Sequence, residues 1–183
     1  MALLHTPTAE LESKCPDFKL PSLDGKTYTL KDFKNDHSLV VMFICNHCPY
    51  VKAIEERLIQ LGHDFKSLNV NLVAICSNDG ETYPDDSIEN LKKNYLAKKM
   101  SFYYLHDKSQ QVAKDFGAVC TPDFFVYDKD HRLAYRGRLD DSWKEANQVT
   151  KRELYEAVVS LENDQPAPKN QISSMGCSIK WLK

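Results

Sequence analysis

The sequence has neither a surplus of basic residues nor a long hydrophobic run, and each absence excludes a class of partner. Lys and Arg number 24 against 26 Asp and Glu, a formal net charge of −2, so no surplus cation is present to neutralise a phosphate backbone. The longest apolar run, LVVMFIC at residues 39–45, is less than half of the roughly 20 residues that cross a bilayer. We therefore expect neither nucleic acid nor a membrane as a partner.

The first residues, MALLHTPTAELESK, also have no early Lys or Arg followed by a long apolar stretch, so they do not resemble a secretory signal. We expect a cytosolic protein. In that reducing compartment an even number of cysteines does not predict a disulfide framework. The six cysteines are at positions 15, 45, 48, 76, 120 and 177.

The apolar pattern alternates between strands and helices. Residues 15–34 predict a β-hairpin that turns at Asp24-Gly25, because Gly tolerates a positive φ. Continuous apolar runs indicate strands buried on both faces, and apolar residues spaced by three and four indicate helices. The predicted strands are 39–44, 72–76, 124–128 and 132–136, and the predicted helices are 49–68, 87–99, 109–116 and 150–162.

This order of elements predicts one α/β domain over residues 1–163. A chain of 183 residues suits a single core. After Asn163 two prolines and the loss of periodicity predict an extended C-terminal tail over 164–183, packed on or near the domain. With a Cys-x-x-Cys between the first central strand and its helix, the layout is that of a thioredoxin-like three-layer sandwich with a central mixed sheet and an N-terminal hairpin.

The motif Cys45-Asn46-His47-Cys48 carries the candidate catalytic residues. A helix N-terminus has unpaired N–H groups and partial positive charge, which lower the pKa of a thiol placed there. We place Cys45 at that position as the nucleophile, with Cys48 nearly one turn later and within reach of a disulfide. A positive charge on His47 would stabilise the Cys45 thiolate further.

A Cys-x-x-Cys is also half of a zinc site, which needs a second such pair or two histidines. The sequence has no second Cys-x-x-Cys. His47, Cys120 and Cys177 could complete a ligand set around Cys45 and Cys48, so a metal-binding or metallochaperone role stays open.

Five segments carry a family resemblance, and together they span nearly the whole chain. They are CPDFKLPSLDGKTYTLKDF, CNHCPYVKA, YLHDKSQQVAKDFGAVCTPDFFVYD, YRGRLDD and GCSIKW. The chain resembles the AhpC/TSA (redoxin) group of thioredoxin-fold proteins, in particular its peroxiredoxin-like members. The resemblance implies a thioredoxin fold with a reactive first cysteine.

The resemblance also implies substrate-binding roles for Thr121 and Pro122. Pro122 stands at the start of a core strand, where its missing N–H costs no ladder hydrogen bond. Thioredoxin-like proteins have a cis proline at this point, facing the cysteine pair, and the backbone of the preceding residue is free to pair with a substrate strand. We expect the same of Thr121 and Pro122.

The chain departs from its relatives at several positions. A peroxiredoxin has Pro and Thr seven and three residues before its reactive cysteine, and Val41 and Cys45 stand there in this sequence. The run LVVMFI also has no buried carboxylate of the kind that serves thioredoxin. The proton acceptor for the second cysteine of the motif is therefore open among His47, Asp123 and Glu55.

The other cysteines have separate interpretations. Cys15 and Cys76 are expected to be inert core thiols, since free Cys is among the most buried residue types. Cys120 should lie near the active site, and Cys177 is either a further exchanging thiol or a bystander in the tail. Both are candidate accessory thiols. The segment YRGRLDD, residues 135–141, predicts a turn with surface ion pairs.

The sequence thus predicts a cytosolic thiol-disulfide oxidoreductase without a cofactor or resident metal. The Cys45 thiolate attacks a disulfide of a protein or small molecule, Cys48 resolves the mixed disulfide, and another dithiol reduces the oxidised pair. The alternatives are the metal-binding role, a noncatalytic adaptor and a thiol-dependent peroxidase.

Overall fold

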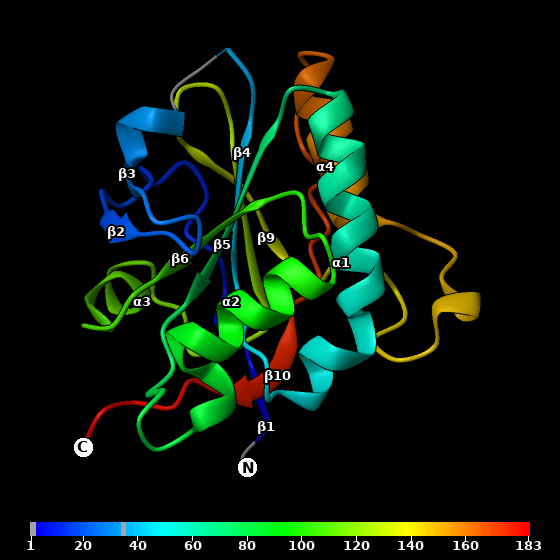
Figure 1. Cartoon of the computed structure of the whole chain (residues 1–183). Helices are drawn as coiled ribbons and strands as arrows, with labels where there is room; N and C mark the ends of the chain where they lie inside the picture. The colour runs from blue at the N-terminus through cyan, green and yellow to red at the C-terminus, as the bar shows by residue number, and fades with distance from the viewer. Residues whose placement is uncertain (1–2, 34–35) are drawn as a thin grey trace.

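A central sheet with the strand order β6-β5-β4-β8-β9 organises the computed structural model (Figure 1). The structure describes residues 3–33 and 36–183, so Lys34, the last residue of the predicted hairpin segment, lies outside the described residues. The strands are β1 (Leu3–His5), β2 (Lys19–Pro21), β3 (Thr27–Thr29), β4 (Leu39–Phe43), β5 (Asn71–Cys76), β6 (Tyr103–His106), β7 (Cys120–Thr121), β8 (Asp123–Tyr127), β9 (Leu133–Gly137) and β10 (Met175–Ser178). The helices are α1 (Pro49–Ser67), α2 (Ile88–Ala97), α3 (Gln111–Asp115) and α4 (Glu153–Glu162), with the 3-10 turns η1 (Leu30–Phe33), η2 (Pro84–Asp86) and η3 (Ala146–Gln148).

The central sheet is mixed. Strand β4 pairs in parallel with β5 and antiparallel with β8, while β5 and β6 are parallel and β8 and β9 antiparallel. The predicted strands, helices and N-terminal hairpin are therefore present, within a few residues at each end. The patterns did not predict β1, β6, β7 and β10, each of which has only two to four residues.

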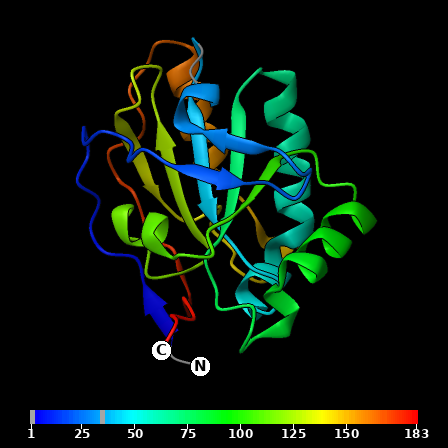
Figure 2. The ribbon, with the colours of Figure 1, turned by 60° about the vertical axis from the view of Figure 1, so that its left-hand side comes forward.

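Two apolar clusters form on the two faces of this sheet, because successive side chains of a strand point in opposite directions. Val40 and Met42 of β4 belong to one cluster, together with the buried faces of α1 and α4. Val41 and Phe43 belong to the other, together with the β2–β3 hairpin and α3. Figure 2 shows the hairpin in front of the sheet and α1 and α4 behind it. The fold has three layers, as predicted.

The C-terminal residues add a second, smaller sheet. Strand β10 lies between β1 and β7 and pairs antiparallel with both. It also packs against α1. The close approach to β7 depends on Gly176, since a Cβ there would lie 1.9 Å from the Thr121 carbonyl oxygen. The tail is thus a paired inner strand where it passes β7.

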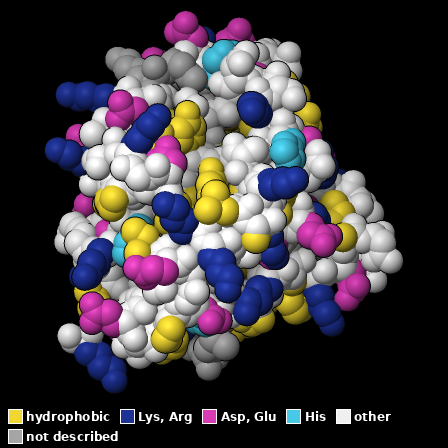
Figure 3. Space-filling view, in the orientation of Figure 1, with side chains coloured by type: hydrophobic (Ala, Val, Ile, Leu, Met, Phe, Trp, Pro, Cys, Tyr) yellow, Lys and Arg dark blue, Asp and Glu magenta, His cyan; other side chains and the backbone are white. Residues whose placement is uncertain are grey.

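The surface is mixed in charge, and Figure 3 shows basic and acidic side chains interspersed on the face in view. Among the helices of the described residues, none is both long and apolar to the degree that crossing a bilayer requires.

The prediction of surface ion pairs in YRGRLDD is wrong for Arg136. This side chain is buried, and its guanidinium lies 2.8 Å from the fully buried Asp123 carboxylate and donates to the Gly117 carbonyl oxygen. Its guanidinium also lies 4.5 Å from the ring centre of Phe125. Arg136 is drawn inward because β9 pairs with β8, which carries the buried acid.

The Asp123–Arg136 pair predicts a pH-dependent stability. Burial raises the pKa of Asp123 from 3.8 to about 6, against the lowering effect of Arg136. The folded state therefore binds a proton more tightly than the unfolded state, so this stabilising contribution is complete below about pH 4 and is lost as the pH rises through 6. The loss amounts to about 3 kcal/mol. Denaturant unfolding across this range should show Asp123→Asn without that decline, and parallel pH profiles of the two proteins would contradict it.

Candidate active site

The helix α1 places its N-terminus on the second cysteine of the motif. Pro49 is the first helical residue, a position where its missing N–H is harmless and its fixed φ suits the helix. Cys48 is the N-cap, in an extended conformation with φ −68° and ψ 122°. Our expectation that Cys45 occupies the helix N-terminus is wrong, since Cys45 lies three residues earlier in the loop after β4.

This placement decides which sulfur carries negative charge. A hydrogen bond from the Cys45 thiol lowers the pKa of Cys48, assisted by Thr121 and by the backbone N–H groups of Cys177 and Val51. The same hydrogen bond, burial and the nearby Asp86 raise the pKa of Cys45 well above its usual value. These effects favour the thiolate form of Cys48 over that of Cys45.

Thr121 contacts both sulfurs. Its hydroxyl lies 3.4 Å from Cys45 Sγ, and its carbonyl oxygen lies 3.1 Å from Cys48 Sγ, where it accepts a hydrogen bond when Cys48 is protonated. The Thr121–Pro122 peptide bond is cis. The structure therefore brings four of the predicted site residues together: Cys45, Cys48, Thr121 and Pro122.

His47 joins this group through a carboxylate that the sequence analysis did not single out. Its Nδ1 lies 2.5 Å from Asp86 Oδ2 and 3.9 Å from Cys45 Sγ. The ring stacks on Tyr83, with 5.2 Å between centroids. Asp86 Oδ1 accepts from the backbone N–H groups of Asn46 and His47, and Oδ2 also accepts from the Asn78 amide. Asp86 therefore fixes the loop that carries Cys45.

The other proposed proton acceptors lie in different surroundings. Asp123 pairs with Arg136, and Glu55 on α1 bonds with Lys98 and Asn94. Asp86 was missed because Pro84-Asp85-Asp86 reads as an ordinary polar turn before a helix. No spacing in the sequence relates that turn to a cysteine about forty residues earlier.

The candidate accessory thiols lie on the two strands beside the pair. Cys120 is on β7, where burial raises its pKa to about 12 and its Sγ faces the Pro122 carbonyl oxygen at 3.9 Å. Cys177 on β10 is paired in register with Thr121. The backbone of Thr121 is thus not free to receive a substrate strand, which corrects our expectation.

Cys45, His47 and Asp86 are also the one group of potential metal donors found among the described residues, with ligand atoms within 4.8 Å of one another. A soft thiolate and an imidazole suit zinc or copper. However, the Asp86 oxygens already accept four hydrogen bonds, and Asp86 Oδ2 and His47 Nδ1 bond directly to each other. A metal would have to displace several of these contacts.

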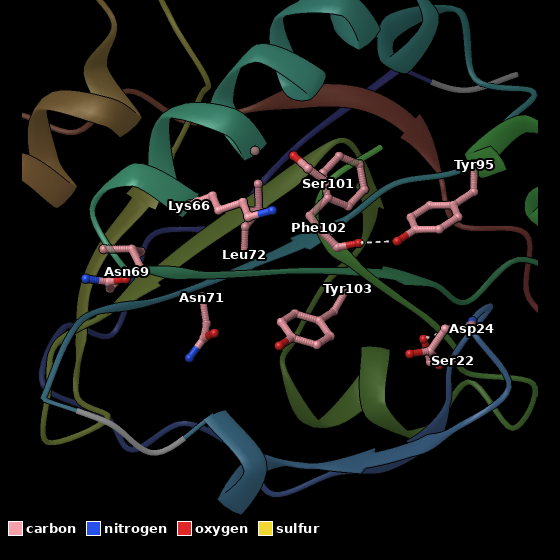
Figure 4. A pocket seen from close by; sticks show the side chains of 12 residues that line it. Ser22, Asp24, Lys66, Asn69, Asn71, Leu72, Tyr95, Ser101, Phe102 and Tyr103 are labelled. Carbon is pink, nitrogen blue, oxygen red and sulfur yellow. Dashed lines mark hydrogen bonds between the residues drawn. The ribbon is translucent and has the colours of Figure 1, made fainter. Parts of the chain in front are cut away.

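Two cavities differ in their relation to the cysteines. One of about 540 Å³ lies beside the start of β5 and β6, where Figure 4 shows Lys66, Asn69, Tyr95 and Tyr103. Its lining has no cysteine or histidine. The other, of about 450 Å³, has Pro122 in its wall. Tyr50 and the half-exposed Trp143 also line it, with ring centres 5.0 Å apart.

Comparison with known proteins gives relatives of two kinds. The crystal structure of an uncharacterized conserved protein from Geobacillus kaustophilus is 42% identical, with a TM-score of 0.94, and the match covers 100% of this chain and 97% of that one. The thiol-disulfide oxidoreductase ResA of Bacillus thuringiensis is 25% identical over 124 residues, which cover 68% of this chain and 67% of ResA.

A thioredoxin domain of a thiol-disulfide oxidoreductase from Bacteroides vulgatus is 18% identical, with a TM-score of 0.59 over 70% of this chain and 89% of that one. This likeness confirms the predicted thioredoxin-like fold. Residues 11–136, well over half of the chain, match the AhpC/TSA family. The chain therefore belongs to the AhpC/TSA family, as its motifs predicted.

Proposed function

We propose that this protein is a thiol-disulfide oxidoreductase whose working group is the Cys45–Cys48 pair. The observation that carries the proposal is the pair of sulfurs that both contact Thr121 at the N-terminus of α1, where the pKa of Cys48 is lowered, because the thiolate is the nucleophile in disulfide exchange. ResA, a relative by sequence, is named for the same activity.

Cys45 attacks the substrate. Cys48 is buried and enclosed by Thr121, Val51 and Cys177, whereas Cys45, also buried, lies in the loop before the helix. As Cys45 attacks one sulfur of a disulfide, its proton passes along the existing hydrogen bond to Cys48. The substrate S–S bond breaks, and the leaving sulfur departs as a thiolate that is then protonated. The Cys48 thiolate thus serves as the base for Cys45.

Cys48 then resolves the mixed disulfide. It attacks Cys45 Sγ, and the bond between Cys45 and the second substrate sulfur breaks. That sulfur leaves with the proton that Cys48 had received, and the Cys45–Cys48 disulfide forms. The Cys45 thiol no longer donates a hydrogen bond at this stage, but the N–H groups of Val51 and Cys177 still stabilise the Cys48 thiolate. The lowered pKa of Cys48 supports this step, because a thiol that ionises readily needs no strong base.

The substrate side of the proposal rests on the cavity beside Pro122. Aromatic side chains such as Tyr50 and Trp143 favour an apolar segment of a protein or small-molecule disulfide next to the cysteine pair. We further propose that the protein works in the cytosol and that a separate dithiol reduces the oxidised pair.

Substitution Cys48→Ser should trap the mixed disulfide. Without the resolving sulfur, incubation with glutathione disulfide leaves one glutathione attached to Cys45, whereas the wild type proceeds to the internal disulfide. Mass spectrometry of the intact and digested protein after acid quenching measures both. The matched control is Cys45→Ser, which should take up no stable glutathione. If glutathione attaches stably to Cys48 in Cys45→Ser and does not attach to Cys45 in Cys48→Ser, the proposed roles of the two cysteines are reversed.

A thiol peroxidase is the second candidate, and the lowered pKa of Cys48 at the helix N-terminus favours it. Hydrogen peroxide is smaller than any disulfide substrate. Attack of the Cys48 thiolate would break the O–O bond and leave a sulfenic acid on Cys48. Condensation with the Cys45 thiol would then release water and form the same disulfide.

Dithiol-dependent peroxide consumption separates the two activities. A peroxidase should consume peroxide faster than the Cys48→Ser variant, with Cys45→Ser also impaired because its disulfide cannot form. If wild type and Cys48→Ser consume peroxide at the same rate, this candidate is excluded and the exchange activity is unaffected.

A further inference from the structure

The C-terminal strand β10 brings a third thiol to the cysteine pair. Cys177 is the residue of β10 that stands opposite Thr121 in the antiparallel register, and Thr121 is the residue that contacts both Cys45 and Cys48. The thiol of Cys177 forms a hydrogen bond with Cys48, and its backbone N–H also acts on Cys48. Three sulfurs thus meet around one threonine.

The position of Cys177 is fixed by the fold. Strand β10 is held on its other edge by β1, where Leu3 stands opposite Cys177. Beyond the strand, the Lys180 N–H donates to the Asn78 side chain, and the Gln110 side chain donates to the Lys180 carbonyl oxygen. Gly176 allows the contact with the Thr121 carbonyl, which any side chain would block. These restraints hold the sulfur of Cys177, which is 3% exposed, at the pair.

We propose that Cys177 is a third exchanging thiol, which takes over the disulfide of the Cys45–Cys48 pair by bonding to Cys48. The inference rests on the proposed function, because it needs the oxidised pair as its starting state. Cys177 attacks Cys48 Sγ, the Cys45–Cys48 bond breaks, and the electron pair leaves on Cys45 Sγ, which receives the proton that Cys177 gave up. No external oxidant or reductant is consumed.

The charge on Cys48 controls this step. Burial, together with the hydrogen bond and negative charge of Cys48, raises the pKa of Cys177 to about 11. Once Cys48 is part of a disulfide, its charge is gone and only burial opposes ionisation of Cys177. Cys177 therefore becomes a better nucleophile when the pair is oxidised, and Cys48 is then an electrophile in contact with it.

The consequence is a second oxidised form of the protein. The Cys48–Cys177 disulfide would join the N-terminus of α1 to β10, and Cys45 would again be a free thiol. An oxidised chain could then engage a further disulfide through Cys45. This gives the C-terminal strand, which occupies the edge expected for a substrate strand, a chemical role at the site.

Peptide mapping of the full chain tests the exchange. Trypsin leaves Cys45 and Cys48 together in one peptide that ends at Lys52, whereas Cys177 lies in the separate peptide 170–180. Wild type equilibrated with reduced and oxidised glutathione, acid-quenched and alkylated, should give both the internal Cys45–Cys48 disulfide and a cross-link between the two peptides with Cys45 alkylated. Absence of that cross-link overturns the proposal.

Three variants complete the test. Cys45→Ser, oxidised with hydrogen peroxide, should convert to the Cys48–Cys177 disulfide, and an oxidised Cys48 beside an alkylatable Cys177 would contradict the proposal. Cys120→Ser is the matched control, a buried thiol on the neighbouring strand, and should keep the cross-link. Cys177→Ser should lose the cross-link but retain the Cys45–Cys48 disulfide. If the Cys45–Cys48 disulfide does not form in Cys177→Ser, the result counts against the proposed function rather than against this inference.

Discussion

The hydrogen bond between the thiols of Cys45 and Cys48 is the interaction on which the site depends. The two buried sulfurs affect each other's ionisation, and their surroundings favour a negative charge on one of them over the other. Asp86 disfavours a charge on Cys45, while the N–H groups around the first turn of α1 favour one on Cys48. Because the helix begins at Pro49, the amide-stabilised sulfur is the second cysteine of the motif. This arrangement makes Cys48 first a base and then a resolving nucleophile.

The surroundings of the pair are assembled from distant parts of the chain. Thr121 reaches both sulfurs because β8, which follows it, pairs with β4, the strand that leads to Cys45. Asp86 arrives from the turn before α2 and fixes the loop by its bonds to Asn46 and His47. The C-terminal strand covers the edge of β7. In this thioredoxin-like fold, the edge of β7 beside the cysteine pair is therefore occupied by β10 of the same chain.

The sequence predicted the features that local pattern determines. Continuous apolar runs located β4 and β5, helical spacing after Pro49 located α1, and the Cys-x-x-Cys between strand and helix located the site. Local pattern could not show that the pKa of Cys48 is lowered and that of Cys45 raised. Those shifts depend on where Asp86 and Cys177 lie in space. Short strands such as β10 escape periodicity, since four residues make no repeat.

Titration of the thiolates by ultraviolet absorbance tests the charge assignment most directly. Burial raises the pKa of Cys120 to about 12 and that of Cys177 to about 11, with the charge of Cys48 adding to the latter. Cys48, whose pKa is lowered, should therefore be the thiol that ionises below about pH 8, the range of unperturbed thiols. We expect one thiolate to appear in that range in the wild type and none in Cys48→Ser. If Cys48→Ser shows the same thiolate signal as the wild type, the account is contradicted. The signal would then belong to a cysteine other than Cys48.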